Sequence, residues 1–194
     1  AIKHPKWKMG YKNSIDSATL VNKCLEVVEA HYLFDIPFNK INVLIHPEAI
    51  VHSIIQNCNY TSNMNLFKND MDIPIINFLM KSKKSKKYKF KKNLHFKNYN
   101  CFNFKQIEKE YFPIYSFFSN LDKSDPKNII KFNIGNEYAV NLFKSGLIKY
   151  TEIYKIIKKI CSLKLYYNTN TIKDIIIFHE KFEKKIKSSF EYKI

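Results

Sequence analysis

A lysine-rich run, KSKKSKKYKFKK from Lys81 to Lys92, divides the hydrophobic pattern of this chain in two. A stretch with this many charges and no apolar periodicity buries no face of a helix or strand, so it is typical of a solvated segment. We therefore expect a connector over residues 81–106, between a first region (residues 1–80) and a second region (residues 107–194). A basic arm that binds polyanions is the alternative interpretation of the same run.

The first region predicts a helix, two strands and the start of a second helix. The first helix is expected from Ser17 to Leu33, because Leu20, Val21, Cys24, Leu25, Val28 and Leu33 recur at helical spacing. Asp16 and Ser17 offer side-chain oxygens that suit the N-cap of this helix. Two short, β-branched segments, INVLIHP (41–47) and AIVHSIIQ (49–56), predict buried strands, and IPIINFLM (73–80) predicts a helix.

The second region predicts a helical bundle. CFNF (101–104) predicts a strand just before it, and four helices are expected over residues 111–118, 134–146, 151–163 and 171–190. Gly146 stands where a helix commonly ends with a left-handed residue. The fold class is therefore α+β: part of an α/β catalytic domain with a small sheet, then a connector and a C-terminal helical domain.

The composition excludes several classes of protein. Hydrophobic residues make up 45% and aromatic residues 15% of the chain, which indicates a folded protein, and no apolar run is long enough to span a membrane. The net charge of +16 invites a nucleic-acid function, but every basic residue is Lys, whereas Arg is the main reader of guanine and phosphate. Four widely spaced cysteines predict neither disulfides nor a zinc site, and three glycines leave no dinucleotide-binding turn in this chain.

A candidate site lies on the helix predicted from Ser17. The first turn of a helix presents unpaired N–H groups and the positive end of the macrodipole, which favour a phosphate. Ser17 would add a hydroxyl at that end, and Asn22, Lys23 and Glu26 would follow as a polar stripe. Glu26 could hold Mg²⁺ or Mn²⁺ through its oxygens. The alternative is an ordinary amphipathic helix with Lys23 and Glu26 as a surface pair.

A family resemblance bears on that choice. Residues 4–26 read HPKWKMGYKNSIDSATLVNKCLE, and INVLIHPEAIVHS follows from residue 41. Together with NDMDIPI (69–75), FP (112–113) and NIGNEYAVNLF (133–143), this run resembles 1-deoxy-D-xylulose 5-phosphate reductoisomerases over the whole chain. The resemblance implies the C-terminal half of such an enzyme, with the NADPH-binding domain and most metal ligands upstream of Ala1.

The resemblance also implies roles for particular residues. His4 and Trp7 correspond to substrate-contacting residues of a mobile lid (residues 4–11), and the cofactor-binding positions correspond to Met9, Gly10 and Met71. The remaining substrate ligands correspond to Ser17, Asn22, Lys23 and Glu26. Glu26 is the implied metal ligand, and the implied catalytic residues are His4, Lys23 and Glu26.

The chain departs from the family pattern at several positions. Cys24 stands for a common Gly and is expected on the buried side of the helix. Asn13 occupies a position that is usually apolar in the family, and Lys81 and Ser82 occupy the place of a Trp-Pro pair. Gly135 interrupts a helix segment that usually reads Asn-Ala-Ala-Asn-Glu. The polar site residues are intact.

The implied reaction is the metal- and NADPH-dependent conversion of 1-deoxy-D-xylulose 5-phosphate to 2-C-methyl-D-erythritol 4-phosphate, in non-mevalonate isoprenoid biosynthesis. The resemblance implies a sugar phosphate substrate, a homodimer, no nucleic-acid or membrane partner, and a bacterial cytoplasm or a plastid or apicoplast stroma. A fragment without the nucleotide-binding domain is expected to be inactive alone. The alternatives are a basic nucleic-acid-binding domain and a paralogue that has lost turnover.

Overall fold

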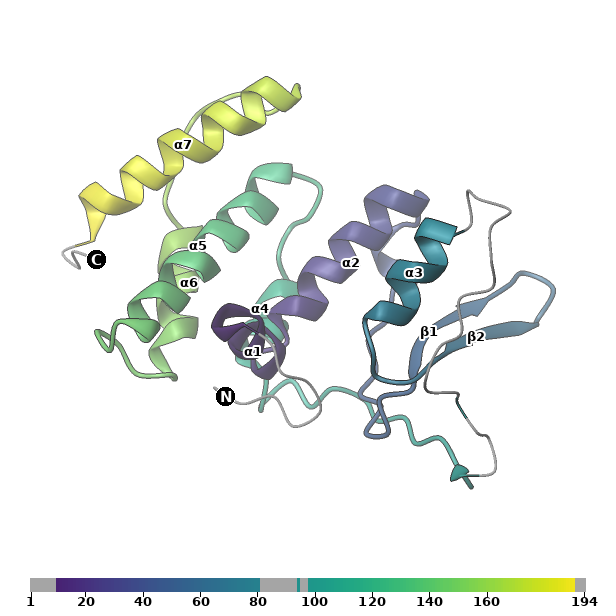
Figure 1. Cartoon of the computed structure of the whole chain (residues 1–194). Helices are drawn as coiled ribbons and strands as arrows, with labels where there is room; N and C mark the ends of the chain where they lie inside the picture. Colours follow the sequence, from purple (N-terminus) through teal and green to yellow (C-terminus); the bar gives the residue numbers. More distant parts are fainter. Residues whose placement is uncertain (1–9, 81–93, 95–97, 191–194) are drawn as a thin grey trace. The chain divides into compact units, whose positions relative to one another are not determined.

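The computed structural model describes residues 10–80, 94 and 98–190 and is shown in Figure 1. The chain is rich in helix and contains a small two-stranded sheet, in agreement with the α+β class. The described residues form two compact units, one of residues 10–42 and 108–190 and the other of residues 43–80, 94 and 98–107. The contacts thus group residues 10–42 with the helical region, whereas the sequence-based boundaries grouped them with residues 43–80. The boundaries at 80 and 107 remain a prediction about the domains of the whole protein.

The predicted helix from Ser17 to Leu33 is wrong at its beginning. The structure has two helices there, α1 (Tyr11–Ala18) and α2 (Val21–Phe34), followed by the short 3₁₀ helix η1 (Phe38–Lys40). Leu20 separates α1 from α2 because it adopts a left-handed conformation, with φ 61°. Such a conformation costs a non-glycine residue about 1–2 kcal/mol, so the break depends on the contacts around it.

The four helices predicted for the second region are confirmed. They are α4 (Pro113–Ser119), α5 (Pro126–Lys144), α6 (Glu152–Cys161) and α7 (Ile172–Ser189). Helix α5 begins earlier than its apolar pattern suggests, because the Asp125 side chain accepts a hydrogen bond from the Lys127 N–H and Pro126 occupies the first turn. Gly146 follows α5 with φ 73°, the left-handed conformation expected for it.

Helices α6 and α7 both pack against α5 (Figure 1). The apolar stripe of α6 consists of Ile153, Ile156, Ile157 and Ile160, all buried at the spacing that defines one helix face. On α5, a Cβ placed on Gly135 would lie 3.2 Å from Cγ2 of Ile160, so the glycine allows α5 and α6 to approach closely. Cys24 is completely buried in the same core, as expected.

The second unit contains the sheet. Strand β1 (Val51–Gln56) pairs antiparallel with β2 (Ser62–Leu66), and helix α3 (Asp72–Met80) follows. The prediction of a strand at 49–56 and a helix at 73–80 is confirmed, although most residues of β1 are exposed rather than buried. Strand β2, rich in Ser and Asn, was not predicted.

The predicted strands at 41–47 and 101–104 are wrong. In place of strands, the structure has an isolated antiparallel bridge between Ile45 and Lys105. His46 stabilises this contact, since its Nδ1 lies 2.8 Å from the Asn103 carbonyl oxygen and 2.9 Å from Glu48 Oε2. The Asn103 side chain in turn donates to Glu48, which lowers the pKa of that carboxyl below its ordinary value. A side-chain network therefore replaces the expected backbone ladder.

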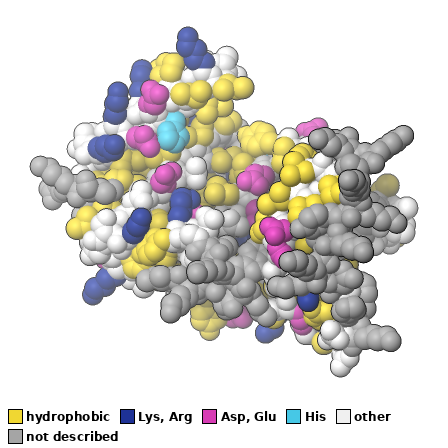
Figure 2. Space-filling view, in the orientation of Figure 1, with side chains coloured by type: hydrophobic (Ala, Val, Ile, Leu, Met, Phe, Trp, Pro, Cys, Tyr) yellow, Lys and Arg dark blue, Asp and Glu magenta, His cyan; other side chains and the backbone are white. Residues whose placement is uncertain are grey.

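Charged side chains are dispersed on the face of the molecule shown in Figure 2. On the face shown in Figure 2, lysines are scattered among acidic and hydrophobic side chains rather than gathered in one stripe. The lysine-rich run itself lies outside the described residues, so the basic-arm alternative remains a prediction. No helix within the described ranges is both long and apolar enough to cross a membrane.

Candidate functional site on helix α2

Three of the predicted site residues form one hydrogen-bonded cluster on α2. Lys23 Nζ donates to both carboxylate oxygens of Glu26, at 2.9 Å to Oε1 and 2.7 Å to Oε2. Asn22 Nδ2 donates to the same Oε1 at 2.5 Å. The side chains of Lys23 and Glu26 are 45% and 46% exposed, so a ligand can reach both of them. We call Asn22, Lys23 and Glu26 the α2 cluster.

The position of Ser17 corrects the sequence-based interpretation of the anion-binding end. Ser17 lies in the last turn of α1, which is the negative end of that helix, and not in the first turn of α2. Helix α2 begins at Val21, and the Leu20 carbonyl accepts from the Cys24 N–H. The first-turn N–H groups and the positive end of the dipole therefore belong to residues 21–23, which include Asn22 and Lys23 themselves.

Asp16 also has a different role from the predicted N-cap. Its carboxylate points into the protein, where Oδ1 accepts a hydrogen bond from Asn136 Nδ2 of α5 at 2.8 Å. Lys12 Nζ donates to the other oxygen at 2.6 Å. Sequence reasoning missed Asn136, because nothing in the local pattern of α5 indicates a partner 120 residues away.

Glu26 can supply one metal ligand. Its carboxylate oxygens are of the kind that Mg²⁺ and Mn²⁺ prefer, and its side chain is half exposed. Within residues 10–80, 94 and 98–190, no group of three or more His, Cys, Asp and Glu side chains is arranged to hold a metal ion. The Glu26 carboxylate, which is the predicted metal ligand, therefore suits a divalent ion in its chemistry and its exposure.

The remaining predicted residues are placed only in part. Gly10 is exposed immediately before α1, and its carbonyl oxygen accepts from the Ser14 N–H. Met71, which is 51% exposed, immediately precedes α3 in the second unit. His4, Trp7 and Met9 lie outside the described residues.

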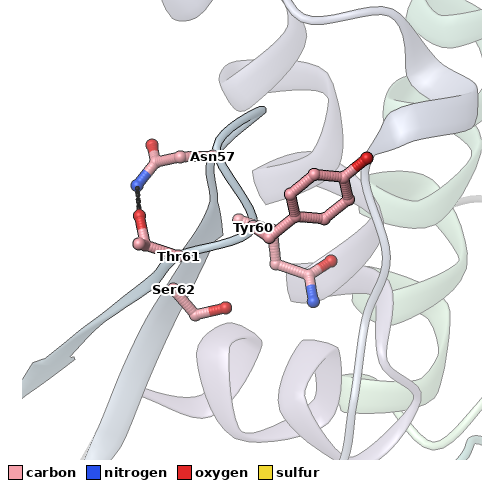
Figure 3. A pocket seen from close by; sticks show the side chains of 5 residues that line it. Asn57, Tyr60, Thr61 and Ser62 are labelled. Carbon is pink, nitrogen blue, oxygen red and sulfur yellow. Dashed lines mark hydrogen bonds between the residues drawn. The ribbon is translucent and has the colours of Figure 1, made fainter.

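A pocket lies elsewhere, at the turn of the β1–β2 hairpin (Figure 3). It is lined by Gln56, Asn57, Tyr60, Thr61 and Ser62. Asn57 donates to the Thr61 hydroxyl, and Tyr60 adopts φ 64°, so these polar groups stabilise the turn itself. None of these side chains is a carboxylate, a thiol or an imidazole, and none belongs to the predicted site.

Comparison with known proteins gives a consistent result. A family model described as 1-deoxy-D-xylulose 5-phosphate reductoisomerase C-terminal domain matches residues 1–34, which include the α2 cluster. A second one, DXP reductoisomerase C-terminal domain, matches residues 66–185, more than half of the chain.

Curated relatives carry the same name. The 1-deoxy-D-xylulose 5-phosphate reductoisomerase of a Sulfurihydrogenibium species is 38% identical over 181 residues, covering 93% of this chain and 48% of the relative. The enzyme of that name from Clostridium kluyveri is 36% identical over 190 residues, covering 98% of this chain and 49% of the relative. The chain thus spans about half the length of the curated relatives it matches.

Solved structures agree with this assignment. A crystal structure of DOX-P reductoisomerase in complex with NADPH, fosmidomycin and magnesium superposes with a TM-score of 0.84 at 28% identity, covering 97% of this chain and 48% of that one. The Zymomonas mobilis enzyme in complex with NADPH gives a TM-score of 0.82 at 27% identity, with 94% and 48% covered. The chain belongs to the 1-deoxy-D-xylulose 5-phosphate reductoisomerase family, within whose members it corresponds to the C-terminal part.

Proposed function

We propose that this chain is the C-terminal half of an enzyme that converts 1-deoxy-D-xylulose 5-phosphate to 2-C-methyl-D-erythritol 4-phosphate with NADPH and Mg²⁺ or Mn²⁺. The α2 cluster is the observation that carries the proposal, because it joins an amide, an ammonium and a carboxylate at the positive end of a helix. The family assignment supports it, as do relatives whose names or titles specify this activity, NADPH and magnesium.

The residues of the α2 cluster divide the substrate between them. Lys23 and Asn22 bind the phosphate, aided by the first-turn N–H groups of α2, and the Ser17 hydroxyl contacts the phosphate from the end of α1. The phosphate does not react, so these contacts supply remote binding energy that holds the reacting carbons in place.

Glu26 holds the divalent ion, which when bound supplies Lewis-acid polarisation of the substrate carbonyl and hydroxyl oxygens. Without ligands, Lys23 neutralises the Glu26 carboxylate. In a loaded site, the Glu26 carboxylate would pair with the ion, and the Lys23 ammonium would pair with the phosphate. Each of these two charges would then have an opposite charge beside it, which would limit the free-energy cost of removing both side chains from water.

The lid residues and the cofactor-binding positions complete the proposal. His4 and Trp7 contact and cover the substrate, and closure of the lid excludes water from the reacting centre. NADPH, when bound, supplies the hydride, and Met9, Gly10 and Met71 orient its nicotinamide. The enzyme acts as a homodimer in the non-mevalonate route to isoprenoids.

The test is a turnover assay on the full-length enzyme that contains this chain. NADPH oxidation is followed after addition of 1-deoxy-D-xylulose 5-phosphate, with Mg²⁺, with Mn²⁺ and with excess chelator. We expect turnover that requires both the sugar phosphate and the metal. A folded full-length protein that oxidises no NADPH under these conditions would instead be a paralogue that has lost turnover.

A further inference from the structure

Two polar side chains outside the proposed site are buried in the core of the first unit. Asn136 on α5 is completely buried, and Asp16 on α1 is 3% exposed. A buried carboxylate is costly unless each oxygen has a partner, and here Asn136 and Lys12 each donate to one oxygen of Asp16. Within the described residues, the Asn136 Oδ1 has no hydrogen-bond partner. The bond from Asn136 Nδ2 to Asp16 is therefore what accounts for an amide at this position.

This bond lies next to the turn that carries the proposed site. Asp16 immediately precedes Ser17, and the α1–α2 turn follows at Thr19 and Leu20. Thr19 is also buried, and its hydroxyl donates to the Ile15 carbonyl at 2.9 Å, with the Asp16 carbonyl at 3.3 Å. The buried face of α1 therefore connects directly to the backbone from which Asn22 and Lys23 project.

The directional nature of a hydrogen bond gives the Asp16–Asn136 pair a specific effect. Apolar contacts favour burial but are not directional, so they restrict the rotation of a short helix only loosely. A hydrogen bond weakens steeply when its angle departs from linearity, so it specifies one rotation of α1 against α5. Ser17 lies next to Asp16 on α1, and its placement depends on that rotation.

We propose that Asp16 and Asn136 are positioning residues for the phosphate end of the substrate site, acting through the α1–α2 turn. This inference rests on the proposed function. Neither residue contacts the substrate. Their hydrogen bond fixes the orientation of α1, so that the Ser17 hydroxyl and the first turn of α2 face the same phosphate.

The experiment measures the KM for 1-deoxy-D-xylulose 5-phosphate and the KM for NADPH in the full-length enzyme. Asp16→Leu keeps the approximate size of the side chain but removes the acceptor, and Asn136→Asp replaces the donor with a second carboxylate facing Asp16. We expect each variant to raise the KM for the sugar phosphate about tenfold, because small misplacements of binding groups have large kinetic effects, while the KM for NADPH stays at the wild-type value.

A double variant and a matched control separate positioning from stability. Asp16→Asn combined with Asn136→Asp restores a donor and an acceptor across the same gap, and we expect it to recover most of the lost affinity. Ile153→Val removes one methylene from the same core, away from the turn, and we expect a lower melting temperature with an unchanged KM.

Each outcome decides the question. If the wild-type enzyme is active and both single variants keep the wild-type KM for the sugar phosphate, the positioning role is overturned while the proposed function stands. The same holds if both KM values rise together or if Ile153→Val raises the sugar phosphate KM equally. An inactive wild-type enzyme overturns the proposed function and this inference with it. If Asn136→Asp fails to fold, the Asp16→Leu result decides alone.

Discussion

Lys23 and Glu26 share hydrogen bonds, yet the proposal gives them different tasks, and this difference can be measured. In the full-length enzyme, Glu26→Gln keeps the size and polarity of the side chain but removes the charge that holds the metal. We expect kcat to fall at least about 100-fold, because metal-bound polarisation contributes several kcal/mol to the transition state. Lys23→Ala removes a charge-assisted bond of about 1.5–3 kcal/mol, so the KM for the sugar phosphate should rise about tenfold to hundredfold.

Steady-state kinetics at several metal concentrations distinguish the two effects. Glu29 lies three residues after Glu26 on the same helix and is exposed, so Glu29→Gln is the matched control and should leave both constants unchanged. Small and equal changes in Glu26→Gln and Lys23→Ala would contradict the division of tasks.

The buried thiol of Cys24 leads to a second prediction at the residue scale, which concerns the stability of the fold at high pH. Burial raises the pKa of its thiol from 9.0 to about 12, and the positive charge of Lys123 offsets this in part. Between pH 9 and pH 12 the unfolded chain therefore binds fewer protons than the folded one, so stability falls as pH rises. One such thiol contributes up to about 1.4 kcal/mol per pH unit.

The measurement is the melting temperature from pH 7.5 to pH 10.5. Cys161 has the same shift for the same reason, so the wild type should lose stability steeply. Cys24→Ala should flatten the slope, although a small cavity lowers its starting stability. Cys58 is exposed, and Cys58→Ala should keep the wild-type slope. Identical slopes for all three proteins would show that Cys24 ionises as easily in the folded state as in the unfolded chain.

The sequence predicted the candidate site unevenly, for reasons visible in single residues. Asn22 and Lys23 lie four and three positions before Glu26, so helical geometry alone brings both of them to Glu26. The hydroxyl of Ser17 and the carboxylate of Asp16 suited an N-cap equally well on local grounds. The actual partner of Asp16 is Asn136, and only tertiary structure could reveal it.

At the scale of elements, the close contact between α5 and α6 reverses the effect on stability that helix propensity predicts for Gly135→Ala. Glycine inside a helix costs about 1 kcal/mol relative to alanine, so propensity alone predicts that Gly135→Ala stabilises the protein. The added Cβ would lie 3.2 Å from Cγ2 and 3.4 Å from Cβ of Ile160. Overpacking of this kind costs about 1–3 kcal/mol, so we expect Gly135→Ala to lower stability by about 1 kcal/mol.

Urea unfolding of four proteins tests this prediction: wild type, Gly135→Ala, Ile160→Ala and the double variant. Ile160→Ala removes the contacting methyl group, so in that background the alanine at position 135 should be stabilising. A stabilising effect in both backgrounds would mean that α5 and α6 separate without cost.

Element prediction from sequence succeeded where one face is buried. Helix α6 shows this best, since its four isoleucines define a single stripe and all of them are buried. The break between α1 and α2 could not be predicted from the sequence. A leucine rarely adopts the left-handed conformation that Leu20 has, and the apolar spacing continues through it. The strand expected at 41–47 did not form a ladder, because the His46 ring and the Glu48 carboxylate bind the backbone carbonyl and N–H of Asn103.

At the scale of the whole molecule, the alignments cover nearly all of this chain but about half of each relative. Among the described residues, no group of three or more His, Cys, Asp and Glu side chains is arranged to hold a metal ion, and Glu26 is the one metal ligand that we propose. The proposed activity and the predicted homodimer are therefore tested on the full-length protein that contains this chain.

The most direct test of the central claim, that α2 carries a metal ligand, is Mn²⁺ binding to the full-length enzyme, followed by electron paramagnetic resonance. We predict one tight site in the wild type and in Glu29→Gln, and at least about tenfold weaker binding in Glu26→Gln, because Gln lacks the charged oxygens that the ion prefers. Wild-type affinity for Mn²⁺ in a folded Glu26→Gln enzyme would contradict the account.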